Sequence, residues 1–485
     1  MSNSKIYFTL AFVAFALFVL LGPLQPFLVE TAALTPFYVT GVSSGAGVAL
    51  PFGLLHYVAS GLQSCFALPW LGASLFTAFL VAVVYAQKWA FRVSDNWFGL
   101  CWVVPFLLFA HFTQMGYLIY TTKAVAPAYV PVLEVLLGVL LLGCLRVGLS
   151  RWWKGWKSSP AATGSKRVVL LVVNVLLFVG SAIAAYSYTF RDANFLNTLR
   201  MKHAAEVGEW EQVLRLARDV EQEPTRAQVC LTRLALFKTG RMGEELFAYP
   251  DGSAQYNAPQ NQWLRLMIGP LLYYHYGKTG FAYRWAMEDM VEYGERPAYL
   301  RYLHSVARLN GEDALALRYE RALARTLFYR NMCKLEDQEA TAIRPLLNYT
   351  DQLDGDNGLV EFYLLNSFAL SEGGSREMVE LSLMDGLITK NLAGFWPRFM
   401  ALLPTWQGHV PTHYQEAALM VTQLQGGSPL RDLSVIDPAV QQRFQRLVEA
   451  SARMGDNAAN AAALRPEFGN TYWYYYFFVE GLKTN

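Results

Sequence analysis

Long apolar runs in the first 190 residues are the feature that most limits what this chain can fold into. A bilayer core about 30 Å thick is crossed by about 20 apolar residues in a helix. Four segments meet this requirement cleanly, and a fifth is rich in aromatic residues and carries Pro105 and His111. We therefore predict a transmembrane domain over residues 1–190. Its five spans are residues 6–21, 67–87, 97–119, 126–145 and 168–185.

The segment 51–66 is apolar but too short for a comfortable crossing. It reads PFGLLHYVASGLQSCF and lies between the first two predicted spans. An apolar stretch of this length is typical of an interfacial or re-entrant helix. We therefore predict such a helix here and not a sixth span.

Lysine and arginine follow a strong bias between the loops. If the N-terminus lies in the cytoplasm, the inner loops carry nine positive charges and the outer loops carry only Lys123. The positive-inside rule favours this orientation, and five spans then place everything after residue 185 outside the cytoplasm. In a bacterium the chain is then a multi-pass inner-membrane protein with a periplasmic C-terminal domain. The nine residues are Lys5, Lys88, Arg92, Arg146, Arg151, Lys154, Lys157, Lys166 and Arg167.

Beyond residue 190 the composition becomes that of an ordinary water-soluble helical domain. Acidic and basic residues are interspersed over 191–485, and the whole chain has a net charge of only +2. So small an excess does not indicate a nucleic-acid partner.

A repeated pattern runs through this second half: an apolar helix, a glycine turn and a second helix. Gly208 and Gly240 lie 32 residues apart, close to the period of tetratricopeptide repeats. The pattern resembles those repeats across much of 197–465, although no unit carries the complete consensus. We predict an all-α fold in which about five transmembrane helices precede an α-solenoid. Weaker copies of the turn occur at Gly277, Gly311, Gly373, Gly374 and Gly455.

Two polar residues fall within predicted spans. His111 and Glu134 could form a proton relay or line a small cavity, because polar groups in lipid are costly and often functional. The alternative, which we favour, is that they lock two helices together or that Glu134 stays protonated. Asn174 is expected to hydrogen-bond between helices.

The densest aromatic run, YWYYYFF, covers residues 472–478. An exposed patch of Tyr472, Trp473, Tyr474 and Tyr475 could dock a protein partner or a glycan. A terminal helix whose rings cap the last repeat is favoured, because the last unit of a solenoid must cover an open core.

Catalytic and metal-binding motifs are lacking. The sequence has no glycine-rich phosphate loop, no H-E-x-x-H and no C-x-x-C. His409, His413 and Glu416 could hold a metal, but a capped helix with His413 packed on the preceding unit is favoured. We expect no cofactor and no metal, and a binding protein rather than an enzyme. A disulfide between Cys230 and Cys333 stays open.

Two apolar segments near the N-terminus and two segments near the C-terminus carry a family resemblance. They are Pro51-Phe-Gly-Leu-Leu with Pro69-Trp-Leu-Gly-Ala73, Pro411-Thr-His-Tyr-Gln-Glu-Ala417 and Thr471-Tyr-Trp-Tyr-Tyr-Tyr476. With them the chain resembles an uncharacterised family of bacterial multi-pass inner-membrane proteins with degenerate repeat C-termini. This resemblance implies an architecture and a membrane setting but no activity.

Two functions follow from this organisation. The leading hypothesis is a membrane-anchored helical-repeat scaffold that binds a protein or peptide partner on the periplasmic side. The alternative is a membrane enzyme or transporter that handles a lipid-linked or small substrate at the outer face of the bilayer. That alternative predicts a deep pocket joining Glu30, His56, His111 and Glu134.

Overall fold

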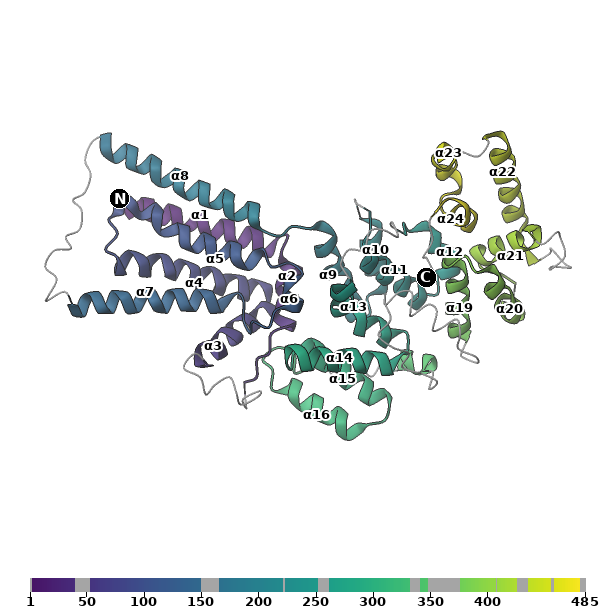
Figure 1. Cartoon of the computed structure of the whole chain (residues 1–485), viewed down its shortest axis with the longest axis horizontal. Coiled ribbons are helices and arrows are strands. Elements are labelled where there is room, and N and C mark those ends of the chain that lie inside the picture. Colours follow the sequence, from purple (N-terminus) through teal and green to yellow (C-terminus); the bar gives the residue numbers. More distant parts are fainter. Residues whose placement is uncertain are drawn as a thin grey trace. The chain divides into compact units, whose positions relative to one another are not determined.

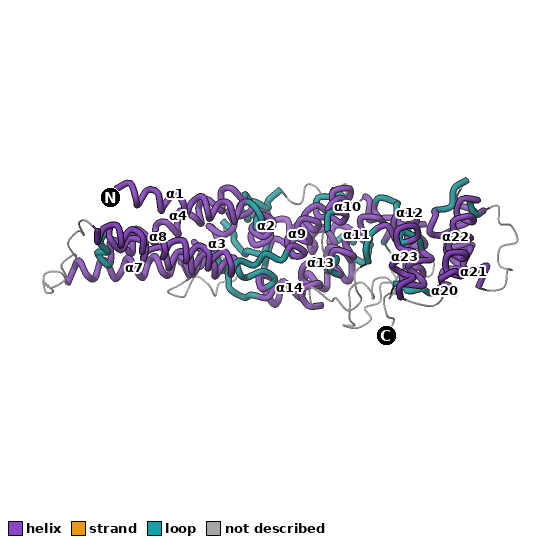
Figure 2. Tube along the Cα trace, turned by 90° about the horizontal axis from the view of Figure 1, so that it is seen from above, coloured by secondary structure: helices purple, strands orange, loops and turns teal. Residues whose placement is uncertain are grey.

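The described part of the chain is helical and contains no strand (Figures 1 and 2). This confirms the all-α class predicted from the sequence. The structure, a computed structural model, describes residues 2–39, 53–149, 165–220, 223–251, 261–331, 341–347, 376–406, 408–424, 435–454 and 458–479.

The chain divides into two compact units. The first unit contains Met1–Leu199 together with two later segments, Asp289–Arg301 and Leu317–Cys333. The second unit contains Arg200–Glu288, Tyr302–Ala316 and Lys334–Asn485. The first break lies close to the boundary predicted at residue 190, but the later segments mean that neither unit is one continuous stretch of sequence.

Four helical segments of the first unit are long and apolar enough to cross a membrane, and a bent pair would make a fifth. The four are α4 (Pro69–Ala90), Asp95–Thr113, α7 (Tyr129–Leu149) and α8 (Ser165–Tyr188). The bent pair is α1 (Ser2–Leu21) followed by α2 (Gln25–Ala33), at an angle of 71°. The short segment predicted between the first spans forms α3 (Gly53–Ser64) and η1 (Cys65–Ala67).

The predicted span 97–119 is not one helix. It starts as a 3₁₀ helix, η2 (Asp95–Trp102), continues as α5 (Val103–Thr113) and is followed by α6 (Leu118–Thr121). The break between α5 and α6 contains Gly116, whose φ is +47°. A Cβ at Gly116 would lie 2.7 Å from the ring of Phe190, so only glycine fits this turn.

Aromatic rings form the centre of the first unit. Phe12 of α1 packs on Trp102 and Phe106 at ring-centroid distances of 4.9 and 5.1 Å. Phe178 of α8 lies 5.6 Å from Trp102 and 5.2 Å from Phe106. Tilted and edge-to-face pairs at these distances are favourable, so four elements share one aromatic core.

Asn174 of α8 links its helix to η2, as predicted. Its side-chain oxygen accepts the backbone N–H of Gly99, and its amide donates to the carbonyl of Asn96 at 2.6 Å. The 3₁₀ turns of η2 make these backbone groups available.

The two later segments of the first unit are bonded to its interhelix loops. The Tyr38 hydroxyl donates to the carbonyl of Glu295 at 2.8 Å, and Arg296 donates to the carbonyl of Thr122 at 2.8 Å. The backbone N–H of Val39 donates to the carbonyl of Arg325 at 2.9 Å. This end of the bundle is therefore completed by residues that come much later in the sequence.

Four of the predicted glycine turns of the C-terminal half are confirmed, whereas Gly373, Gly374 and Gly455 lie outside the described residues. Gly208, Gly240, Gly277 and Gly311 all have φ between +67° and +80°, a region that glycine adopts without steric cost. Each separates two helices of the predicted type. The helices of this half are α9 (Ala193–Glu206), α10 (Trp210–Arg218), α11 (Arg226–Lys238), α12 (Met242–Glu245), α13 (Asn261–His275), α14 (Thr279–Tyr293), α15 (Pro297–Leu309), α16 (Asp313–Ala324), α19 (Arg376–Ile388), α20 (Leu392–Leu402), α21 (Thr412–Leu424), α22 (Pro438–Met454), α23 (Ala458–Phe468) and α24 (Tyr472–Phe478), with short 3₁₀ helices η3 (Leu246–Ala248), η5 (Arg344–Leu346) and η6 (Leu403–Thr405).

Within the second unit, packing does not follow sequence order. α11 packs on α10 and α13, but α12 packs on α21, and α21 also contacts α20, α22 and α24 (Figure 1). A Cβ at Gly243 of α12 would lie 2.4 Å from Pro411, which shows how close this approach is. In a solenoid each unit contacts only its sequence neighbours. The contact between α12 and α21 departs from that rule.

Candidate functional site

A cleft of about 830 Å³ is the candidate functional site of the second unit. One wall is η3 and the residues that follow it, with Arg233 of α11 behind them. The other wall is the turn between α23 and α24 together with α24 itself. The contact between α12 and α21, which does not follow sequence order, therefore helps to form the cleft, because it brings residues near 250 close to residues near 470.

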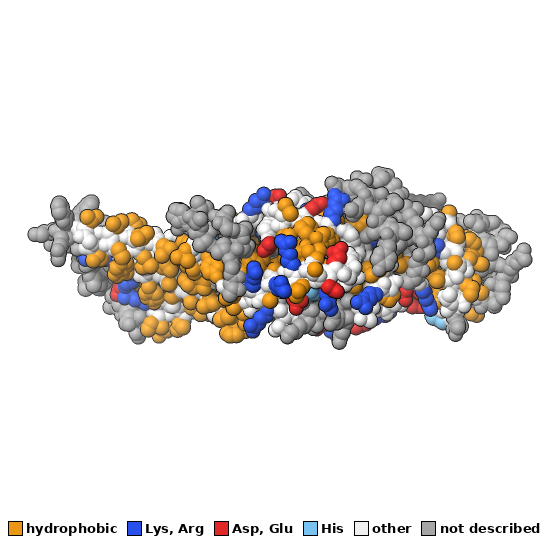
Figure 3. All heavy atoms as spheres, turned by 90° about the horizontal axis from the view of Figure 1, so that it is seen from below, with side chains coloured by type: hydrophobic (Ala, Val, Ile, Leu, Met, Phe, Trp, Pro, Cys, Tyr) orange, Lys and Arg blue, Asp and Glu red, His pale blue; other side chains and the backbone are white. Residues whose placement is uncertain are grey.

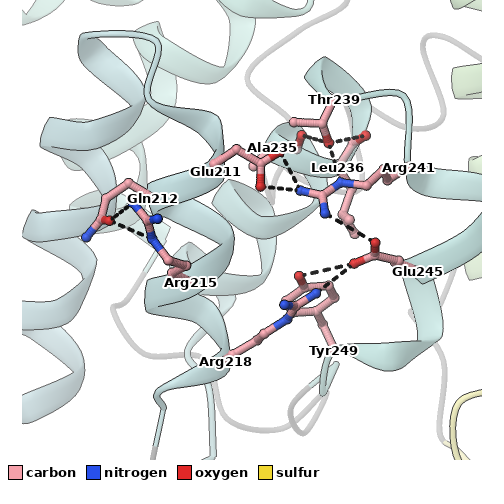
Figure 4. Close-up of polar contacts among 10 residues, drawn as sticks. All are labelled: Glu211, Gln212, Arg215, Arg218, Ala235, Leu236, Thr239, Arg241, Glu245 and Tyr249. Carbon is pink, nitrogen blue, oxygen red and sulfur yellow. Dashed lines mark hydrogen bonds and ion pairs between the residues drawn. The ribbon is translucent and has the colours of Figure 1, made fainter.

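A network of charged side chains holds the first wall (Figure 4). Arg241 donates to both carboxylate oxygens of Glu211 at 2.8 and 2.7 Å, and to Glu245 at 3.2 Å. Arg218 donates to Glu245 at 2.9 Å. One guanidinium nitrogen of Arg241 bonds both Glu211 oxygens, and this surface contact joins the turn before α12 to α10.

Tyr249 connects this network to the cleft. Its hydroxyl donates to Glu245 at 3.5 Å, and the Arg218 guanidinium lies 5.4 Å from its ring centroid (Figure 4). Burial raises the pKa of the Tyr249 phenol, so it stays protonated at neutral pH. Its ring is therefore fixed as a neutral aromatic surface on the cleft wall.

A buried ion pair lies beside Tyr249. Arg233 and Asp251 form a salt bridge, and Arg226 donates to the Asp251 carbonyl at 2.7 Å. Both arginines are buried in α11. Because a buried charge needs a partner, Asp251 and Arg233 neutralise one another, and Asp251 is not a free general base.

Glu416 fixes the second wall. Its carboxylate accepts the backbone N–H of Tyr472 at 2.8 Å and also contacts His413 Nδ1 at 2.9 Å. The indole N–H of Trp473 donates to the Glu416 carbonyl at 2.8 Å. Glu416, Tyr472 and Trp473 are buried, so α24 is bonded firmly to α21.

The predicted aromatic patch is not an exposed surface. Tyr472 and Trp473 are fully buried, and Tyr474 and Tyr475 are nearly so. Their packing is that of a terminal helix covering the preceding helices, the alternative that the sequence favoured. Tyr474 and Tyr475 nevertheless line the cleft, whereas the exposed large rings at this end are Phe477 and Phe478.

Tyr474 and Tyr475 both use their hydroxyls within the fold. The Tyr474 hydroxyl donates to the carbonyl of Ala461 at 3.0 Å, and that of Tyr475 donates to Ile388 at 2.8 Å. Phe247 of η3 lies 4.9 Å from the Tyr475 ring, so the two walls touch at the base. The rings present carbon surface to the cleft.

The predicted intramembrane residues are not gathered into one site. His111 on α5 and Glu134 on α7 are both exposed, and no hydrogen bond or ion pair joins them in the described structure. Glu30 is buried and accepts a hydrogen bond from the Tyr120 hydroxyl at 2.8 Å. His56 is half-buried. The four residues therefore differ in their surroundings and share no hydrogen-bond network among the described residues.

The candidate metal ligands are also separated. His409 is exposed and contacts Glu244 at 2.9 Å, whereas His413 is buried against Glu416 and Phe247. No group of three or more metal-binding side chains occurs within the described ranges. Cys230 is buried in α11, and Cys333 lies outside the described residues.

Reasoning from the sequence missed most of the cleft. Arg233, Tyr249, Asp251 and Arg465 carry no local motif, and the last lies more than 200 positions beyond the others. One signal did exist. The two C-terminal segments that carried the family resemblance pack on one another through Glu416 and Tyr472.

Fold and site together define an all-helical protein with an apolar helical unit and a second unit that contains a cleft. The chain belongs to a family of unknown function (DUF6057), which matches residues 123–479. The match includes α7, α8 and both walls of the cleft. No curated protein and no solved structure matches the chain. The predicted relation to an uncharacterised family is confirmed at this level.

Proposed function

We propose that this chain is a membrane-anchored binding protein. The first unit is the anchor, and the second unit binds a segment of a protein or peptide partner outside the cytoplasm. The observation that carries the proposal is the aromatic cleft between η3 and α24, in which the buried Glu416–Tyr472 contact fixes the α24 wall. Rigid, concave aromatic surfaces are the usual setting of binding hot spots.

Exposed apolar side chains support insertion of the first unit in a bilayer. Only 17% of the apolar window of α7, and 17% of that of α8, is buried within the protein. Leucine, valine and isoleucine side chains cover the remaining surface of these helices, and Figure 3 shows one such apolar face. A surface of this size is stable only against lipid or another protein.

The arrangement of lysines supports the proposed orientation. Lys5 of α1 and Lys88 of α4 both pair with Asp95, so the start of α1, the end of α4 and the start of η2 lie together. Arg146, near the end of α7, donates to the carbonyl of Trp89 at this same end. Positive charge collected at one end of the bundle fits a cytoplasmic N-terminus and a periplasmic second unit in a bacterial inner membrane.

The enzyme or transporter alternative has less support. Its candidate residues, His111 and Glu134, lie on exposed faces, and Asp251 in the cleft is neutralised by Arg233. The second unit instead offers a cleft lined by aromatic side chains, which suits a segment of a protein or peptide partner.

Site-specific photo-crosslinking in membranes tests the proposal. A photoreactive phenylalanine replaces Phe478, which lines the cleft, or Val448, an exposed residue of α22 that does not. We expect a defined set of protein or peptide adducts at position 478 that is absent at position 448. Identical adducts at both positions, or none at 478, would refute partner binding in the cleft.

A further inference from the structure

We propose that the cleft recognises a peptide carboxylate beside an apolar side chain, and that Arg465 is the carboxylate-binding residue. The inference rests on the proposed function and specifies its ligand. Two observations support it. Most charged side chains of the cleft already form ion pairs or hydrogen bonds, and the aromatic walls present carbon surface.

Among the described residues, the charged groups of the cleft leave the Arg465 side chain without a partner. Arg233 is paired with Asp251, and Glu223 is also engaged in an interaction within the protein. Arg465 lines the cleft, is exposed, and makes no side-chain hydrogen bond or ion pair with any described residue. A guanidinium left in a partly enclosed site favours an anion, and its fork of donors matches a carboxylate.

The last turn of α23 carries Arg465, and the turn that follows it supplies a second donor, Asn470. The Arg465 stem lies along Gly469, because a Cβ at Gly469 would be only 3.0 Å from Arg465 Cγ. Next to it, the side-chain oxygen of Asn470 accepts a hydrogen bond from Arg443 at 2.7 Å. That bond orients the amide and leaves its NH₂ group as the remaining donor.

The aromatic walls select the group beside the carboxylate. Because the hydroxyls of Tyr474 and Tyr475 donate to backbone carbonyls, their donor hydrogens are used within the fold, and these residues contribute mainly ring carbon to the cleft. Phe247 and Phe478 add further carbon surface to the same cleft. A ligand that fills it must place an aliphatic or aromatic side chain there.

The same balance of charge disfavours a phosphate. A phosphate monoester carries nearly two negative charges at neutral pH and is usually held by several cations. Here Arg465, which pairs with no other described residue, lines a cleft that also includes Glu223 and Asp251. A singly charged carboxylate suits this environment better.

A peptide-capture experiment tests the inference on the full-length chain in lipid nanodiscs. Two soluble mixtures of randomised heptapeptides are used. In one the C-termini are free, and in the other every C-terminus is amidated while the Asp and Glu side chains stay free. Retained peptides are sequenced by mass spectrometry. Arg465→Gln removes the proposed carboxylate-binding group. Arg446→Gln is the matched control, because Arg446 is exposed on α22, pairs with Glu467 and does not line the cleft.

We expect the wild-type chain and the Arg446→Gln variant to retain peptides that pair a carboxylate with an apolar side chain. The amidated mixture separates a C-terminal carboxylate from that of Asp or Glu. For a retained peptide, Arg465→Gln should weaken binding about tenfold, the loss of one charge-assisted contact, and Arg465→Lys should weaken it less.

Two results would overturn the inference in distinguishable ways. If wild type retains peptides without enrichment of carboxylates, and Arg465→Gln binds them equally well, the ligand class is wrong but peptide binding stands. If wild type retains no peptide above empty nanodiscs while photo-crosslinking yields no adduct, the proposed function fails and the inference with it.

Discussion

The carboxylate of Glu416 in α21 accepts the backbone N–H of Tyr472, the first residue of α24, across 56 positions of sequence. The first N–H groups of a helix have no partner within it, and a buried carboxylate is a strong acceptor for them. The Thr471 hydroxyl accepts the N–H of Tyr474 at 3.2 Å and completes the cap. One wall of the cleft therefore depends on a single buried acid in another helix.

Replacing Glu416 by glutamine should loosen α24. The change removes a charge-assisted hydrogen bond at a buried site, which costs about 2 kcal/mol. Thermal unfolding of the full-length protein in detergent should shift to lower temperature. Trp473 is fully buried in the wild-type structure, so its fluorescence emission should move to the red when α24 loosens and water reaches the indole. Glu449→Gln, on an exposed face of α22, is the control and should change neither signal. Equal melting curves for both variants would show that Glu416 does not hold the helix.

Asp385 should make the second unit less stable as pH rises. Burial raises the pKa of this carboxyl from 3.8 to about 6, against the opposing charge of Arg398. Its folded pKa lies above its unfolded value, so its stabilising contribution is complete below pH 4 and is lost as pH rises through 6. The difference corresponds to at most about 3 kcal/mol.

The variant Asp385→Asn should therefore be more stable than wild type at pH 7.5 and nearly equal to it at pH 4. Unfolding by denaturant at a series of pH values measures the difference. Asp313→Asn, at an exposed position of α16, is the control and should follow the wild-type curve. A constant difference between Asp385→Asn and wild type across this range would contradict the assignment.

Two glycines of α7 offer a matched test of packing in the first unit. A Cβ at Gly143 would lie 2.1 Å from the ring of Trp89 in α4, whereas a Cβ at Gly138 would meet nothing within 4 Å. Gly143→Ala should lower the melting temperature in detergent, because the α4–α7 contact must open. Gly138→Ala should be neutral or stabilising, since alanine favours helix by about 1 kcal/mol over glycine. Equal behaviour would mean that α4 and α7 do not pack as described.

Cysteine labelling can test the proposed orientation. In a background without native cysteines, Lys123→Cys should react with a membrane-impermeant maleimide in right-side-out vesicles. Arg92→Cys, in the turn after α4, should react only after the vesicles are permeabilised. The reverse pattern would invert the topology and place the cleft in the cytoplasm.

Local features were predictable from the sequence because local energetics determine them. The turns at Gly208 and Gly311 need a positive φ, and glycine between two apolar helices is the usual sign of such a turn. The apolar runs likewise gave the helices α4, α7 and α8 within a few residues. By contrast, the break after Thr113 depends on the contact between Gly116 and Phe190, which are distant in sequence.

The cleft could not be predicted because each of its walls is a long-range contact. Nothing near Tyr249 indicates that it faces the helix 472–478, and nothing near Arg465 indicates that it lacks a partner. The aromatic run itself was recognised in the sequence. What it contributes to the cleft depends on which part of each ring is not covered by neighbouring helices. That is decided by the bonds from Tyr474 to Ala461 and from Tyr475 to Ile388, and not by composition.

The discontinuous first unit has a consequence for the order in which this protein is made. Arg296 and Arg325 complete one end of the helical bundle, yet they are synthesised about 100 or more residues after α8. The ribosome must therefore finish the first part of the second unit before the bundle has all its contacts. The contacts of the first unit are therefore complete only after residue 325 has been synthesised, and a chain cut at residue 191 would lack them.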